Sequence, residues 1–354
     1  MAEQELIFLN TENLYSREDL LNKFPKYRLE QIKSWLNKGI EEFDEMSNIP
    51  KELREYLKSR YFIGSCKIKD KKISQDGTVK YLFELYDGEV IESVVMKYNH
   101  GYSMCLSTQA GCKMGCIFCM TGQGGFARNL FSTEILSQIQ VAQKDLKIKI
   151  SNIVLMGMGE PLDNYKNVLE FIKLVNSKDN LNIGARHISI STCGLVDKIY
   201  ELAKENLQIT LSISLHAPNN LIRDKIMKIN KRWRVEDLIT ACKYYTKITK
   251  RRISFEYIMI KDLNDTVECA HELAKILRGM ICHVNLIPMN NFECDNNNLK
   301  YDLKRSTICD IYRFKNILEK ENINVTIRRT LGQDINGACG QLKYNNTKYN
   351  NFRK

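Results

Sequence analysis

The sequence predicts an α/β fold: an open, partial βα barrel of the TIM type, preceded by a small N-terminal helical module and a β-hairpin. After residue 101, short apolar β-rich runs alternate with amphipathic helical stretches, which is the pattern of βα units around a parallel sheet or barrel. About six or seven such units fit, too few to close an eight-stranded barrel. With 354 residues, 44% of them hydrophobic, the chain can bury one large core and a smaller one.

The elements follow in order along the chain. Residues 1–60 are expected to form the helical module, because Ser16 begins an S-x-x-D capping pattern with Asp19 and because Ile32, Trp35 and Leu36 share a face at helical spacing. Residues 61–100 are expected to form a β-hairpin linker, with a turn at 75–77 and β-rich runs at 81–85 and 90–96. Residues 101–342 are expected to form the barrel and residues 343–354 a basic tail. The expected barrel strands lie near 104–107, 152–158, 187–192, 209–214, 253–260, 283–288 and 324–328.

Composition excludes two classes of protein. No stretch approaches the roughly 18 to 20 apolar residues of a membrane span, and residues 1–10 lack the features of a signal peptide, so we expect a cytoplasmic protein without a membrane segment. Twelve cysteines without a secretion signal favour thiols or metal ligands in a reducing compartment over a disulfide framework.

The formal net charge of +11 gathers in 225–234, 243–252 and 340–354, where aromatic residues lie among the basic ones. Such a surface attracts polyphosphates and supports base stacking, as RNA binding requires. A lysine-rich chain with solvated helix faces would have the same charge. The chemistry of the motifs must therefore decide.

Three cysteines, Cys112, Cys116 and Cys119, form a C-x3-C-x2-C loop directly after the first predicted barrel strand. Three thiolates on one short loop can hold three irons of a [4Fe-4S] cluster and leave the fourth open to a non-protein ligand. The competing interpretation is zinc with Cys105 as fourth ligand, but zinc knuckles usually pair two separated C-x2-C units. The spacing favours the cluster.

Small and polar residues stand where successive predicted strands end. Because the carboxyl ends of parallel strands meet at one mouth, these residues predict a ligand site, in which Glu160 can accept a hydrogen bond from a ligand ammonium. Each alone would fit a structural turn, and His216 alone would fit a hydrogen-bonded turn histidine. The residues are Gly159 and Glu160 in M-G-M-G-E-P-L, Ser191, then Ser214, Leu215 and His216 in S-L-H-A-P, and Asn290.

Cys339 lies between small residues in the D-I-N-G-A-C-G-Q segment after the last predicted strand. Small neighbours allow a thiol to approach a bulky partner closely, as a nucleophilic or carrier thiol must.

From roughly residue 27 to 342 the chain resembles the radical S-adenosylmethionine (SAM) adenosine RNA methyltransferases, the RlmN and Cfr family. The resemblance is carried by Y-R-x-x-Q-I-x-x-W at 27–35, C-x-S-x-Q-x-G-C at 105–112, M-G-M-G-E-P-L at 156–162, S-L-H-A-P at 214–218 and A-C-G-Q-L at 338–342. It implies SAM and one [4Fe-4S] cluster as cofactors, with an adenosine of 23S ribosomal RNA and one of transfer RNA beside the anticodon as substrates. We further expect an electron donor such as flavodoxin or ferredoxin, and a monomer.

The resemblance also implies the roles of single residues. Cys112, Cys116 and Cys119 would bind the cluster, Cys339 would carry the methyl group as S-methylcysteine, Cys105 would be its redox partner, and Glu92 would be the proton acceptor. The residues implied around SAM are Gly159, Glu160, Ser191, Ser214, Leu215, His216 and Asn290.

Within the family, Pro161, Ala217 and the run at 286–290 resemble the branch that methylates carbon 2 of adenine. The alternative is the antibiotic-resistance branch, which methylates carbon 8. A radical-SAM activase or maturase would share the cluster loop but would not need Cys105 and Cys339 together. A non-catalytic RNA-binding metal protein would share the basic surface but would have no use for a SAM pocket.

Overall fold

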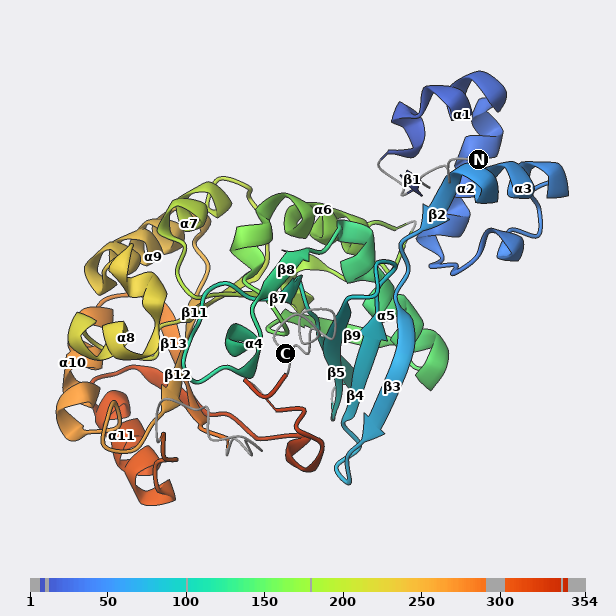
Figure 1. Cartoon of the computed structure of the whole chain (residues 1–354). Helices are drawn as coiled ribbons and strands as arrows, with labels where there is room; N and C mark the ends of the chain where they lie inside the picture. The colour runs from blue at the N-terminus through green and yellow to red at the C-terminus, as the bar shows by residue number, and fades with distance from the viewer. Residues whose placement is uncertain are drawn as a thin grey trace, which may run out of the picture.

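A curved ten-stranded sheet forms the body of the protein in a computed structural model that describes residues 7–9, 13–99, 101–178, 180–290, 303–338 and 340–342. The strand order is β14-β13-β12-β11-β10-β9-β6-β5-β4-β3, so β14 and β3 are its two edges and the sheet does not close (Figure 1). From β6 to β14 neighbouring strands are parallel. These strands are β6 (Gly101–Cys105), β9 (Ile150–Leu155), β10 (Ile188–Thr192), β11 (Thr210–Ser214), β12 (Ile253–Met259), β13 (Cys282–Pro288) and β14 (Asn324–Ile327). The expected open, partial barrel is confirmed.

Amphipathic helices cover the outer side of the curved sheet (Figure 1). Their apolar stripes and the outward side chains of the parallel strands form one large buried core. The helices are α5 (Ser132–Leu146), α6 (Tyr165–Asn176), α7 (Val196–Leu202), α8 (Asn220–Ile226), α9 (Val235–Thr249), α10 (Val267–Leu277) and α11 (Ile308–Lys320). Short 3-10 helices are η3 (Pro161–Asn164), η4 (Ala185–His187), η5 (Lys228–Lys231) and η6 (Gln333–Ile335). Among the described residues, no helix has the length and apolarity to cross a lipid bilayer.

The segment predicted as a hairpin linker differs from the prediction. It holds β3 (Lys67–Ile73), β4 (Val79–Glu84) and β5 (Val90–Tyr98), and antiparallel pairing of β5 with β6 makes all three part of the main sheet. Seven consecutive buried residues in β5 explain the difference, because a strand covered on both faces belongs inside a sheet rather than in a linker.

The N-terminal helices form a separate apolar core and project from the barrel (Figure 1). They are α1 (Glu18–Lys23), α2 (Lys26–Asn37) and α3 (Lys51–Arg60), with η1 (Leu14–Ser16) and η2 (Phe43–Glu45) between them. β1 (Ile7–Leu9) pairs in parallel with β2 (Tyr61–Ile63), so this unit includes residues beyond position 60. The Gln140 side chain of α5 donates to the Asn37 carbonyl at 2.5 Å and joins the module to the barrel.

The predicted cap of the first helix is wrong. Helix α1 begins at Glu18 after Arg17, and the Ser16 hydroxyl donates to the Asn13 carbonyl instead of capping. Asp19 accepts hydrogen bonds from the Tyr56 and Tyr61 hydroxyls and thereby ties α1 to α3 and β2.

Candidate active site

The cluster loop, residues 112–119, leaves a small two-stranded sheet and ends on a short helix. Cys112 follows β7 (Gln109–Gly111), which pairs antiparallel with β8 (Phe126–Asn129), and its amide donates to the Gly125 carbonyl at 2.7 Å. Cys119 precedes α4 (Met120–Gln123), and its amide donates to the Cys116 carbonyl at 3.2 Å. The loop thus brings all three cysteines to the wall of one cleft, of about 930 Å³ including its open mouth.

The chemistry of these thiols fits an iron-sulfur cluster. Burial raises the pKa of the Cys112 thiol to about 12 and also raises the pKa of Cys116, and the neighbouring thiols add to both shifts. Three neighbouring sulfurs that repel one another as thiolates need a strongly positive partner, which iron supplies.

The arrangement disfavours the zinc alternative. Within the described part of the chain, no three His, Cys, Asp or Glu side chains gather closely enough to hold a single metal ion. Zinc needs such a compact tetrahedral set, whereas each cysteine of a cubane cluster binds a different iron. Cys105, the fourth ligand of the zinc interpretation, lines a different cavity.

Glu160 lies in the cleft just beyond the end of β9. It is buried, and its two carboxylate oxygens accept hydrogen bonds from the Leu162 amide at 3.0 Å and the Cys193 amide at 2.7 Å. Burial raises the pKa of Glu160, and these backbone donors oppose the rise. The side chains of Cys193 and Thr192 also donate to this carboxylate, so a ligand ammonium would share an oxygen with these donors or replace one of them.

His216 follows β11 with a left-handed backbone, φ +58°, and its ring lines the cleft. The Ile258 amide donates to Nδ1 at 3.0 Å, so the ring proton lies on Nε2. Burial and the positive charge of Arg223 lower the pKa of His216 to about 3 and keep the ring neutral. His216 is therefore both a hydrogen-bonded turn histidine and part of the cleft wall.

The other residues expected around SAM divide between two places. Gly159, Ser191 and Ser214 line the same cleft, and the two serine hydroxyls lie 3.4 Å apart. Leu215 is buried behind the wall, where its carbonyl accepts a hydrogen bond from Arg223. Asn290 lines a second cavity rather than the cleft.

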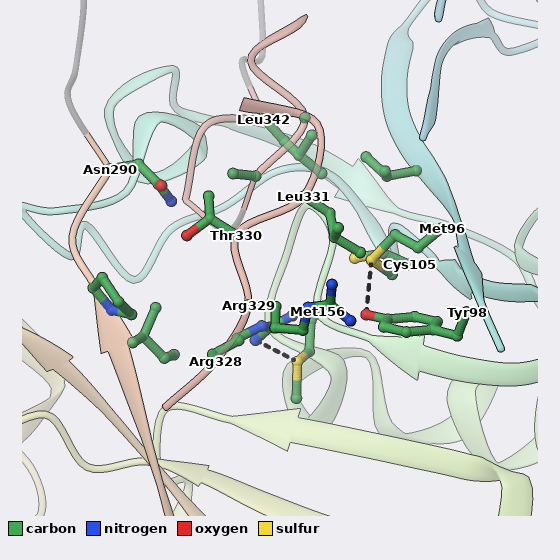
Figure 2. Close-up of a pocket in the computed structure, with 15 residues that line it drawn as sticks. Met96, Tyr98, Cys105, Met156, Asn290, Arg328, Arg329, Thr330, Leu331 and Leu342 are labelled. Carbon is green, nitrogen blue, oxygen red and sulfur yellow. Dashed lines mark hydrogen bonds between the residues drawn. The ribbon is translucent and has the colours of Figure 1, made fainter. Parts of the chain in front are cut away.

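The second cavity, of about 580 Å³, adjoins the cleft. Figure 2 shows Asn290 and Cys105 entering it from opposite sides. The two cavities have part of their wall in common. The shared residues are Met156, Ile287, Arg328 and Leu342.

Cys339 lies outside the described residues, but both of its neighbours are described. Ala338 lines the second cavity and Gly340 lines the cleft. The Gly340 carbonyl accepts from the Met120 amide at 2.9 Å, and the Leu342 carbonyl accepts from the Thr121 hydroxyl at 2.7 Å. These bonds hold the C-terminal segment, residues 340–342, against α4, beside the cluster loop.

Glu92 is buried on β5 and is not among the residues that line either cavity. Alternation along the strand places it on the same face as Val94 and Met96, which line the second cavity. Lys80 on β4 lies 2.9 Å from the Glu92 carboxylate and also donates to the Asn336 carbonyl at 3.2 Å. This buried ion pair connects β4 and β5 to the segment that leads to position 339.

Sequence reasoning missed several polar residues around the cavities. Gln109 accepts the Glu160 amide at 2.8 Å and Ser107 accepts the Met158 amide at 2.9 Å, so the C-x-S-x-Q motif holds the glycine-rich strand end. Glu256 lines the cleft, and a carboxylate inside the apolar strand β12 was the signal that could have revealed it. Arg223 gave no signal, because it stands among many basic residues.

Comparisons with known proteins identify the family. The family model "Radical SAM superfamily" matches residues 106–274, and the model "Ribosomal RNA large subunit methyltransferase N-terminal domain" matches residues 20–63. A protein of Clostridium novyi described as "Probable dual-specificity RNA methyltransferase RlmN" is 53% identical over 93% of this chain and 95% of its own length. A protein of Clostridium tetani with the same description is 51% identical over 93% of both chains.

A solved structure has the same fold over nearly the whole chain. The crystal structure of a radical SAM methyltransferase from Sphaerobacter thermophilus is 38% identical and superposes with a TM-score of 0.87, covering 94% of this chain and 97% of that one. The expected family is therefore confirmed: the chain belongs to the RlmN family of radical SAM RNA methyltransferases.

Proposed function

We propose that this enzyme methylates carbon 2 of an adenosine in 23S ribosomal RNA, and of a transfer-RNA adenosine beside the anticodon, by way of a methyl group carried on Cys339. The relatives described as dual-specificity RNA methyltransferases support two RNA substrates. The sequence features of the carbon-2 branch, Pro161 and Ala217 among them, support the choice of carbon.

The observation that carries the proposal is the pair of adjoining cavities. One is lined by the three cluster cysteines together with Glu160 and His216, and the other by Cys105 and Ala338. A site that generates a reactive group therefore lies next to a site that holds the proposed redox thiol. Because the two cavities have part of their wall in common, a base bound in one would lie beside the other.

Bound at the cleft, the cluster and SAM would supply reductive cleavage of SAM to a carbon radical, which an electron-poor ring carbon requires. The chain's own residues would do the rest. Cys339 would carry the carbon that joins adenine, Glu92 would accept the proton that leaves the base carbon, and Cys105 would form the disulfide with Cys339 that releases the product. Glu92 lies on the face of β5 that borders the second cavity, which supports its role.

The expected partners belong to the same proposal. The adenosine must leave its stack to enter the site, at a cost of a few kcal/mol that phosphate and aromatic contacts can offset. The N-terminal module, which matches the methyltransferase N-terminal model, is a candidate for these contacts. We propose that the enzyme works as a monomer in the cytoplasm, with flavodoxin or ferredoxin as its electron donor.

Two cysteine variants test the proposal because they should fail at different steps. Cys339→Ala has no sulfur to carry the methyl group, so neither methylated protein nor a covalent RNA adduct should form, although SAM is still cleaved. Cys105→Ala can load the methyl group and join the base but cannot release it. It should accumulate joined to RNA, seen as a shifted band on a denaturing gel that nuclease digestion reverses.

The matched control is Cys309→Ala, because Cys309 is exposed. This variant should methylate RNA like the wild type and trap no adduct. If Cys105→Ala turns over repeatedly without trapped RNA, Cys105 is only a packing residue and the two-cysteine scheme is wrong.

A further inference from the structure

We propose that Arg223 is a positioning residue whose buried positive charge stabilises the reduced state of the cluster held by Cys112, Cys116 and Cys119. The inference rests on the proposed function, since it needs a cluster on these cysteines. It assigns a role to a residue that does not line the cleft and that the methyl-transfer scheme leaves unused.

Arg223 lies on α8 and is fully buried. All four of its hydrogen bonds go to neutral acceptors. Nε donates to the Leu215 carbonyl at 3.1 Å, Nη1 to the Asn230 side chain at 3.1 Å, and Nη2 to the carbonyls of Cys193 at 2.6 Å and Ser214 at 3.3 Å. The guanidinium thus joins the carboxyl ends of β10 and β11, where Ser214 and His216 enter the cleft.

The charge of Arg223 has no ion-pair partner among the described residues. Asp224, the neighbouring carboxylate, is part-exposed and pairs with Arg234 at 3.0 Å. A buried charge that keeps only neutral hydrogen-bond partners is costly, and proteins usually pair it with an opposite charge. The hydrogen bonds explain why the guanidinium is held in this orientation, but they do not explain why a charged group is needed there. A negative group bound in the adjacent cleft would complete the pair.

Arg223 lies directly behind the wall of the cleft. The carbonyls of Cys193 and Ser214, two residues that line the cleft, accept its hydrogen bonds. Burial and the positive charge of Arg223 lower the pKa of His216 in the same wall. A backbone hydrogen bond also connects the cluster loop to the helix that carries Arg223. The Ile117 amide donates to the Ile226 carbonyl at the end of α8 at 3.1 Å. Buried protein rather than solvent therefore lies between the cation and the cleft, and it screens the charge less than water would.

The consequence concerns the reduction of the cluster. Three thiolates give the cluster net negative charge, and the added electron increases it, so a nearby buried cation favours the reduced form and raises the potential. Net charge and burial are among the factors that set such potentials. Loss of the positive charge should make the cluster harder to reduce without removing any of its ligands.

The experiment is a potentiometric titration of the reconstituted full-length protein, followed by electron paramagnetic resonance, with iron counted in each sample and no RNA present. Arg223→Gln and Arg223→Lys both lose the forked hydrogen bonds, but only the glutamine variant loses the charge. Arg278→Gln, at a side chain that is 75% exposed, is the control. We expect a more negative midpoint potential for Arg223→Gln, and a value near the wild type for Arg223→Lys and for the control.

A second variant leaves Arg223 in place. The Asn230 amide donates to Asp224 at 2.7 Å, so the double change Asp224→Asn with Asn230→Asp exchanges carboxylate and amide across this contact at constant net charge. The carboxylate then faces the guanidinium and neutralises it. This variant should also show a more negative potential, even if Arg223→Gln fails to fold.

Three outcomes would overturn the inference. Potentials unchanged in Arg223→Gln and in the exchange variant, with full iron content, would show that the charge does not act on the cluster. Equal shifts in the lysine and glutamine variants, with none in the exchange variant, would reduce Arg223 to a hydrogen-bonding clamp. Wild-type protein that binds no cluster would refute the proposed function itself, and this inference with it.

Discussion

Glu160 and His216 stand at the ends of two strands, and backbone N–H groups hold each of them in the wall of the cleft. Such hydrogen bonds fix side-chain direction before any ligand arrives. For His216 they also fix the tautomer, so a neutral ring presents its Nε2 proton. The sequence identified both positions but could not decide between a turn residue and a ligand contact. The hydrogen-bond donors that decide it come later in the chain, from Cys193 for Glu160 and from Ile258 on β12 for His216.

The neutral state of His216 predicts acid sensitivity. The pKa of His216 is about 3 in the folded protein, below the ordinary value of 6.5. As the pH falls below 6.5, this histidine therefore binds a proton in the unfolded chain but not in the folded protein. Stability is then lost between about pH 6.5 and 3. At pH 5 the loss from this residue is about 2 kcal/mol.

Urea denaturation at pH 7.5 and pH 5.0 measures this effect. The fall in unfolding free energy between the two pH values should be smaller in His216→Gln than in the wild type, by about 2 kcal/mol. Equal falls in the two proteins would show that the histidine is charged in the folded state.

At the scale of elements, β7, β8 and α4 shape the cluster loop. Gly111 has φ +78°, and a Cβ at this position would overlap the Gly125 carbonyl, which is the acceptor of the Cys112 amide. Gly111→Ala should therefore displace Cys112 and lower the iron content after reconstitution.

Gly125→Ala is the matched control for this prediction. Gly125 has a similar φ of +86°, but its Cβ would meet no atom within 4 Å. Both variants carry the strain of a left-handed alanine, and only Gly111→Ala adds the clash. Iron content lowered equally in both would attribute the effect to backbone strain rather than to close approach.

The parallel strands were predicted to within a few residues, because apolar, often β-branched residues recur along each of them and alternate with less buried ones in several. Where predictions failed, the physical signal was absent. β3 is an exposed edge strand with four lysines, so it lacks an apolar pattern. The predicted strand 152–158 ends at Leu155, because the residues after it turn into the cleft. The proposed role of Arg223 could not be predicted either, because it depends on contacts with Cys193 and Ser214 at the ends of two strands.

On the scale of the whole molecule, the fold places two cavities side by side at the carboxyl ends of the parallel strands. The antiparallel strands β4 and β5 contribute the buried ion pair of Lys80 and Glu92 near the second cavity. The C-terminal segment packs against α4 through the hydrogen bond from the Met120 amide to the Gly340 carbonyl. The motifs predicted the membership of the cleft well, because chain order and the βα pattern fix where strand ends meet. They could not separate the cleft from the second cavity, which Asn290 and Cys105 line.

The most direct test of the account is mass spectrometry of nucleosides from 23S ribosomal RNA and transfer RNA after incubation with the reconstituted enzyme, SAM and a reductant. We predict 2-methyladenosine from both RNAs with the wild type and none with Cys339→Ala. Detection of 8-methyladenosine instead, or of unmodified adenosine while SAM is cleaved, would contradict the account.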